Sequence, residues 1–256
     1  MNFHDCDMLR HAIHDSRARA NRRGMTRVDL IVCVGVVALL LAIGLPAILQ
    51  LREFMRSQQC VNAIKQTTIA LHAYHDAFGA FPAAHFLGAN GQRYRSWRVE
   101  TLALEDAKPL RATWNDGEPW DHPSNQWFQQ LEHRTPNCPA AGNTVLGETN
   151  QMVIYGEACV FQGAKSRSFR DITDGTSNTL LVGEVIDTGV HWAHPVDLFF
   201  DDLTNVGHSG SFNGRHGYGV QAATVDGSTR VLSRQIDFRL LRSLVTADSG
   251  EEISEF

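Results

Sequence analysis

Apolar residues fill one stretch of the chain, residues 30–49, without interruption by a charged side chain. An α-helix rises about 1.5 Å per residue, so these residues can cross a hydrocarbon core about 30 Å thick. An ordinary secretory signal has a shorter apolar region of about 7–15 residues, and no small-residue cleavage site follows this one. We therefore predict a transmembrane helix over residues 25–51.

Beyond this run the apolar positions change from a continuous stretch to a stripe. Steps of three and four place six side chains on one face of a helix: Val61, Ile64, Thr68, Leu71, His75 and Phe78. Gly79 follows the stripe and Pro82 comes shortly after it, an order typical of a helix end. The pattern predicts that the membrane helix continues as an amphipathic helix over residues 52–79.

The remaining residues, 80–256, predict a globular domain rich in β-structure. Short apolar runs at 152–155 and 180–185 read as strands, and residues 220–233 read as a hairpin around a two-residue Asp-Gly turn. Leucines at 240–244 predict a short helix. Residues 83–150 are loop-rich, and we interpret their tryptophans as anchors of long loops, with a sugar-stacking platform as the alternative. The expected fold class is α+β, with the long helix packed on an antiparallel sheet.

Charge is distributed unevenly along the chain. Residues 1–24 hold five Arg and three Asp, whereas the whole chain has a net charge of −5. Positively charged flanks stay on the cytoplasmic side of a membrane. We therefore predict a cytoplasmic leader over 1–24, a single membrane crossing, and a domain outside the cytoplasm. The acidic balance and the lack of a basic stripe beyond the leader argue against nucleic acid as a partner.

Three of the five cysteines fall outside the leader and the apolar run: Cys60, Cys138 and Cys159. In an oxidising compartment three cysteines suggest one disulfide and one free thiol. No Cys-x-x-Cys motif occurs, which excludes a zinc ribbon and a thioredoxin-like motif.

Residues 23–29, Arg-Gly-Met-Thr-Arg-Val-Asp, followed by an apolar helix, resemble the class III signal of type IV prepilins and type II secretion pseudopilins. The resemblance implies cleavage after Gly24 by a prepilin peptidase and methylation of the new N-terminus, Met25. It also implies that the fifth mature residue, Asp29, contacts the N-terminal amine of a neighbouring subunit. Pro46 falls where many such helices carry a kinking proline. Met25, Asp29 and Arg27 each depart from the usual residue at their position.

Several later segments resemble domain-of-unknown-function family 1559, a bacterial family of prepilin-type proteins. Residues 60–82 match its Cys-x-Asn start, its Leu-His-x-Tyr-His-Asp centre and its Gly-x-Phe-Pro end. Residues 174–184 match an Asp-Gly-Thr-Ser-Asn-Thr run before a strand that ends in Gly-Glu. His216 and Asp226-Gly227 reproduce a C-terminal His-x9-Asp-Gly signature. The resemblance implies a disulfide between Cys60 and Cys138 and a pilin-like arrangement of the fold.

The polar residues suggest two kinds of chemistry, metal binding and catalysis. Asp171, Asp174 and Asn178 offer oxygen ligands that could hold Ca²⁺, but their spacing is not that of an EF-hand, and turn capping explains them without an ion. No cofactor is therefore expected. No Gly-x-Ser-x-Gly elbow and no His-Glu-x-x-His motif occurs, so an enzyme is not expected, and His216 is interpreted as a packed side chain.

The function that follows is structural: a pseudopilin-like subunit of a type II secretion or type IV pilus-type system. Its expected partners are the prepilin peptidase, other pilin-like subunits and the membrane. Its expected location is the bacterial inner membrane, with residues 80–256 in the periplasm. The alternative is a membrane-tethered periplasmic binding module for a solute, a glycan or Ca²⁺. An assembled subunit requires processing after Gly24, whereas a tethered binder keeps its first 24 residues.

Overall fold

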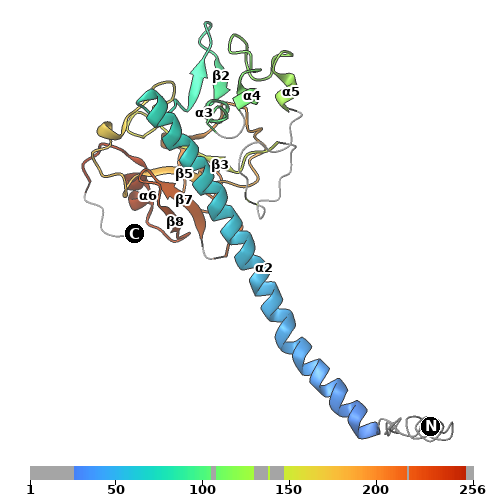
Figure 1. Cartoon of the computed structure of the whole chain (residues 1–256). Helices are drawn as coiled ribbons and strands as arrows, with labels where there is room; N and C mark the ends of the chain where they lie inside the picture. Colours follow the sequence, from blue (N-terminus) through green and yellow to red (C-terminus); the bar gives the residue numbers. More distant parts are fainter. Residues whose placement is uncertain (1–25, 105–107, 130–137, 139–146, 218, 252–256) are drawn as a thin grey trace, which may run out of the picture. The chain divides into compact units, whose positions relative to one another are not determined.

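The computed structural model describes residues 26–104, 108–129, 138, 147–217 and 219–251 (Figure 1). The chain divides into two compact units, Met1–Leu51 and Arg52–Phe256. The predicted leader, including Gly24 and Met25, lies outside the described residues.

The longest element is helix α2, Arg27–Phe78, which continues through Pro46 without a break. Every described residue of its apolar part up to Leu51 is solvent-exposed except Gly44, which is intermediate. Among the described residues it is the one helix long and apolar enough to cross a membrane, a criterion that a signal sequence also meets. The structure is therefore that of an α+β protein with a long, apolar N-terminal helix.

Helix α2 ends where the sequence predicts. The N–H of Gly79 donates to the carbonyl of His75 at 2.7 Å, which satisfies one of the carbonyl groups left open at a helix end. The packed face is narrower than the predicted stripe, because Val61 is only partly buried and Phe78 is exposed and lies against Tyr74. The buried residues of α2 are Ser57, Cys60, Ala63, Ile64, Thr67, Thr68, Ala70 and Leu71. Many of them are small, which lets the helix backbone approach the domain closely.

Three sheets are found among the described residues, and the largest has the strand order β3-β5-β7-β8, antiparallel throughout. The strands of this sheet are β3 Gln151–Met152, β5 Leu180–Glu184, β7 Val220–Thr224 and β8 Thr229–Leu232. Strands β1 His85–Leu87 and β2 Arg93–Ser96 form an antiparallel pair. Strands β4 Ile154–Tyr155 and β6 Leu198–Phe199 pair in parallel, which differs from the purely antiparallel expectation.

Short helices lie between these strands and after the last of them. They are α3 Trp97–Thr101, α4 Lys108–Arg111, α5 Gln126–Gln129, α6 Phe238–Val245 and the 3-10 turns η1 Phe169–Asp171 and η2 Phe200–Asp202. Asp237 caps the N-terminus of helix α6: its carboxylate accepts hydrogen bonds from the N–H groups of Arg239 and Leu240. This helix is the one that the leucines at 240–244 predict.

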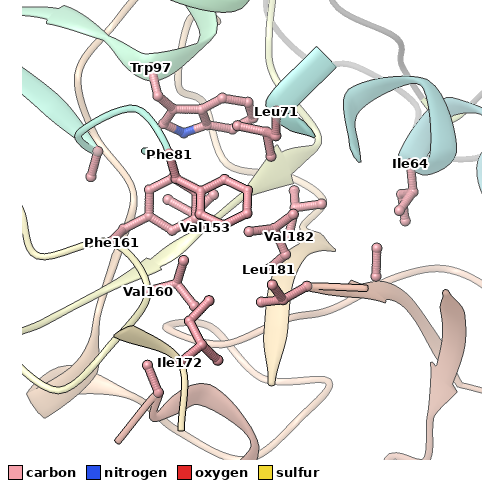
Figure 2. Packing of buried hydrophobic residues seen from close by; sticks show 14 residues of the cluster. Ile64, Leu71, Phe81, Trp97, Val153, Val160, Phe161, Ile172, Leu181 and Val182 are labelled. Atoms are coloured by element: carbon pink, nitrogen blue, oxygen red, sulfur yellow. The ribbon is translucent and has the colours of Figure 1, made fainter. Parts of the chain in front are cut away.

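One hydrophobic core lies between α2 and the four-stranded sheet. Ile64 and Leu71 from the helix pack with Leu181 and Val182 from β5 and with other buried apolar side chains (Figure 2). A further cluster surrounds Trp114, Phe128 and Trp192 in the loop-rich region. Trp114 is buried in that cluster, as expected for the loop anchor that we predicted from the sequence.

Two details of the strands differ from the prediction. The run 152–155 is two short strands in different sheets, because the N–H of Val153 donates to the Asp197 carboxylate at 3.1 Å instead of continuing a ladder. The β7–β8 hairpin has a three-residue loop, Val225–Gly227, rather than a two-residue turn. The N–H of Gly227 donates to the carbonyl of Thr224 and Gly227 has φ +90°, the arrangement of a type I turn followed by a left-handed glycine.

A buried ion pair fixes the loop-rich region to the strands. The guanidinium of Arg98 contacts both carboxylate oxygens of Asp197, the closer at 2.6 Å, and also donates to the carbonyl of Gln151. Trp97 donates its indole N–H to the same carboxylate. Both charged side chains are almost completely buried, so their mutual hydrogen bonds offset a large desolvation cost.

Candidate functional site

The N-terminus of α2 is a capping box. The Asp29 carboxylate accepts hydrogen bonds from the N–H and the hydroxyl of Thr26 at 2.9 and 2.8 Å, and the N–H of Asp29 donates to the Thr26 hydroxyl at 3.2 Å. This reciprocal arrangement satisfies backbone donors that a helix start leaves open. Asp29 therefore has a local structural role, in addition to the assembly contact that the sequence resemblance implies.

The two cysteines paired by the sequence resemblance are joined in the structure. Cys60, on the buried face of α2, forms a disulfide with Cys138, which is 78 residues away in the sequence. Both residues are buried, and Ile186 packs against them. The other cysteine of the domain, Cys159, is a buried free thiol, and burial raises its pKa to about 12. That thiol is therefore protonated and unreactive at neutral pH.

His216 lies directly against the disulfide. Its Nε2 is 3.7 Å from the Cys138 sulfur and 4.0 Å from a carboxylate oxygen of Glu184, at the end of β5. Its Nδ1 is 3.3 Å from a carboxylate oxygen of Glu53, on α2. His216 and Glu184 are buried, whereas Glu53 is exposed. The structure thus gathers two sulfurs, an imidazole and two carboxylates, and we call Cys60, Cys138, Glu184 and His216 the buried cluster.

The glycine-rich loop before β7 makes this gathering possible. A Cβ placed on Gly214 would lie 2.6 Å from a carboxylate oxygen of Glu184, so no larger residue fits there without displacing the carboxylate. Arg234 donates to the carbonyl of Gly214 and holds the loop from the other side. The loop is therefore a packing element that brings His216 to the disulfide, rather than a phosphate-binding loop.

Burial raises the pKa of the Glu184 carboxyl group above its ordinary value. His216, the backbone N–H of Gln221 and Arg234 act in the opposite direction but do not cancel the effect. The ionised form of a buried carboxyl group is costly in an apolar setting, and a positively charged partner would stabilise it.

The signature His-x9-Asp-Gly spans one strand. His216 precedes β7 and Asp226-Gly227 follows it. At the far end His72 of α2 contacts the carbonyl of Val225 at 2.8 Å, and a Cβ on Gly227 would lie 3.4 Å from the His72 ring. Asp226 accepts hydrogen bonds from Thr224 and Ser228 and shapes the turn. The signature therefore holds both ends of β7 against the same helix, at Glu53 and at His72.

Comparison with known proteins places the chain in a family. A family profile described as "Protein of unknown function (DUF1559)" matches residues 50–159 and 146–198, together more than half of the chain. The chain belongs to this family. No curated protein and no solved structure matches it. The DUF1559 match includes Cys60, Cys138 and Glu184 but ends before His216.

The proposed calcium ligands have other partners in this DUF1559 protein. The Asp171 carboxylate accepts hydrogen bonds from the N–H and the hydroxyl of Ser168. The Asp174 carboxylate accepts them from Ser249 and Gly250, and the Asn178 side chain is 3.5 Å from the Asp174 carbonyl. These contacts cap a 3-10 turn and fix the C-terminal segment, which accounts for the three residues structurally.

An open pocket of about 380 Å³ lies at the edge of the domain. Tyr155 and Phe199 form an aromatic wall with ring centroids 5.3 Å apart. Arg93 donates to the Tyr155 hydroxyl at 3.1 Å and covers the ring. The other side chains that line the pocket include His85, Glu157 and Lys165. Burial, aided by Arg93, lowers the pKa of His85 to about 4, so this imidazole is neutral at physiological pH.

Sequence reasoning missed Glu53 and the role of Glu184. The Gly-Glu end of the strand was recognised as part of the family pattern, but no spacing rule links it to residues 32 positions later. The nearest signal was that two motifs of the family pattern, the Cys60 start and the His216 signature, each contain a side chain of a metal-ligating type.

Proposed function

We propose that this DUF1559 protein is a membrane-anchored structural subunit that assembles through the N-terminal part of α2, in the manner of prepilin-type proteins. The observation that carries the proposal is the exposed apolar surface of that part. Between Val28 and Leu51, fifteen large apolar side chains are at least half exposed, far more than a water-soluble surface normally presents. Lipid or the helices of neighbouring subunits would cover them.

Small residues occur along the same segment and support helix association. Gly35 and Gly44 have open space where a Cβ would lie, and Ala38 and Ala42 lie between them. Helices in a membrane associate by close packing, which small residues permit. A single-pass anchor needs no such positions.

The capping box makes the assembly test specific. Asp29→Asn retains an oxygen that can accept hydrogen bonds from Thr26 but loses the charge, whereas Asp29→Ala loses both. If Asp29 meets the amine of a neighbour, both variants should insert into membranes and both should fail to give crosslinked oligomers. Full oligomer formation by Asp29→Asn would show that Asp29 acts only as a cap and would contradict its assembly role.

Processing is tested separately with Gly24→Ala. The proposal expects a precursor about 24 residues longer than the wild-type protein on a gel, because the peptidase cleaves after glycine in the proteins that this signal resembles. Gly35→Ala is the matched control and should leave the mobility unchanged. Identical mobility of Gly24→Ala and wild type would count against processing.

The pocket beside Tyr155 supports a second candidate function, a tethered solute-binding module. Aromatic walls with flanking cations suit a planar or ring-shaped ligand that carries a negative charge, such as a sugar acid. Titration calorimetry with glucuronate, and with glucose as the neutral control, tests it. Glucuronate binding that Tyr155→Ala weakens at least tenfold would favour this function. If neither sugar gives a heat of binding, the solute-binding function is rejected.

A further inference from the structure

The buried cluster contains the donor atoms of a metal site. Cys60, Cys138, Glu184 and His216 each offer one ligand atom, and all four atoms lie within 4.8 Å of one another. All four residues are buried. Metal–ligand bonds of about 2.0–2.3 Å place tetrahedral zinc ligands roughly 3–4 Å apart. The cluster is therefore close to the size of such a site before any ion is present.

The orientation of His216 is that of a ligand. A metal-binding histidine normally donates its second ring N–H to a carboxylate or carbonyl, which fixes the tautomer. Here Nδ1 lies 3.3 Å from the Glu53 carboxylate, so the lone pair of Nε2 points toward the Cys138 sulfur and Glu184. Glu53 thus acts as the orienting carboxylate, outside the buried cluster.

We propose that the buried cluster is a redox-gated zinc site: the disulfide excludes the metal, and the reduced cysteines bind Zn²⁺ together with His216 and Glu184. Two thiolates, one imidazole and one carboxylate form a donor set that Zn²⁺ accepts in tetrahedral geometry. Harder ions such as Mg²⁺ and Ca²⁺ prefer oxygen ligands alone, so the two sulfurs select against them.

The reaction balances with a dithiol reductant. The Cys60–Cys138 bond breaks as the dithiol is oxidised to its own disulfide, and two protons pass to the cysteine sulfurs. Zn²⁺ then displaces both thiol protons to solvent as the two Zn–S bonds form. In the reverse direction a disulfide oxidant accepts the two electrons and two protons from solvent and becomes a dithiol, while the Cys60–Cys138 bond re-forms and the Zn²⁺ ion leaves.

The exchange would preserve one structural tie. In the oxidised state the disulfide links residue 138 to α2, and in the reduced state the metal would make the same link. Three anionic ligands and Zn²⁺ leave a net charge of −1, which Arg234, an electrostatic partner of Glu184, would partly offset. In this state the Zn²⁺ ion would stabilise the buried, ionised carboxylate of Glu184.

The test uses the full chain in detergent, reduced with a phosphine so that no competing thiol is present. Addition of Co²⁺ should give thiolate-to-cobalt charge-transfer absorption and the visible bands of a tetrahedral site, at one ion per chain. Zn²⁺ should abolish both signals by displacement. The oxidised chain should give neither. Reduced protein that takes up no Co²⁺, or oxidised protein that binds equally well, would overturn the proposal.

Variants distinguish a four-ligand metal site from metal binding by the two cysteines alone. Glu184→Gln and His216→Asn should weaken Co²⁺ binding by more than a hundredfold, and Glu53→Gln by about 10–100-fold as an orienting residue. Cys33→Ala, which removes an exposed thiol on α2, is the control and should bind as wild type does. Unchanged affinity in both Glu184→Gln and His216→Asn would overturn the proposal, because His216 would then be only an ion-pair partner of the two carboxylates.

Folding of each variant is checked in the oxidised state, where no metal is needed. A second readout is the melting temperature of the reduced protein, which Zn²⁺ should raise in wild type and in Cys33→Ala. No increase in reduced wild type would contradict the proposed site. This inference does not depend on the assembly role proposed above, since all four ligands come from the second compact unit, Arg52–Phe256, and none from the exposed apolar part of α2.

Discussion

The two parts of α2 have the same secondary structure and opposite surroundings. From Arg27 to Leu51 nearly every side chain is exposed, and from Ser57 to Leu71 one face is buried in the domain. What differs is the pattern, apolar on all sides in the first part and apolar along one stripe in the second. The comparison teaches that the pattern of apolar residues, rather than their number, predicts which part of a helix a domain covers.

The largest expected effect concerns the disulfide of the packed part. The double variant Cys60→Ala/Cys138→Ala should lose about 4 kcal/mol of unfolding free energy, because the bond closes a loop of 78 residues. Cys33→Ala, in the exposed part, should change it by less than about 0.5 kcal/mol. Urea unfolding of the oxidised protein in detergent measures both. Equal, small losses would mean that the tie between α2 and residue 138 contributes little.

A matched leucine pair probes packing directly. Leu71 is fully buried in the core between α2 and the four-stranded sheet, and Leu45 is mostly exposed. Leu71→Ala should cost about 3 kcal/mol through lost burial and the cavity left behind. Leu45→Ala should cost less than about 0.5 kcal/mol. Chemical denaturation followed by tryptophan fluorescence reports on the domain, and comparable losses at the two sites would refute the distinction between the parts.

We expect a smaller loss of unfolding free energy on acidification. It arises in the globular domain rather than in the exposed part of α2. The folded-state pKa of His85 is about 4, below the ordinary value of about 6.5. Unfolded chains therefore bind the proton more readily, and stability falls as the pH drops from about 6.5 toward 4. After discounting for solvent screening we expect a loss of about 1 kcal/mol.

His85→Gln isolates this contribution, because it keeps a polar side chain without titrating. The difference in unfolding free energy between wild type and variant should shrink between pH 7 and pH 4.5. Glu184 acts in the opposite sense, since its raised pKa favours the folded state at low pH, and it contributes equally to both proteins. A difference that is independent of pH would contradict the assignment.

The elements with local signals were predictable from the sequence. The apolar run, the stripe, Gly79 and the leucines at 240–244 predicted α2, its end and α6. Hairpin β7–β8 was predicted, but the predicted loop length was wrong because β7 ends at Thr224, so that Val225 joins Asp226 and Gly227 in the loop. The run at 152–155 was wrong as one strand because a carboxylate 44 residues away, on Asp197, takes the N–H of Val153.

The long-range pairs could not be predicted in this way. Arg98 and Asp197 are 99 residues apart, and Glu53 and His216 are 163 apart. No local pattern in the sequence links the two members of either pair, and only the fold shows that they lie side by side. The cluster around His216 therefore came from the structure, although the disulfide within it was implied by the family resemblance.

The most direct test of the proposed assembly role is the N-terminal residue of the mature protein. Membrane-extracted protein should be sequenced from its N-terminus and its intact mass determined. Processing predicts a chain that begins at Met25 and carries a methyl group on its amine. A chain that still begins at Met1 would contradict the assembled subunit and leave a tethered domain.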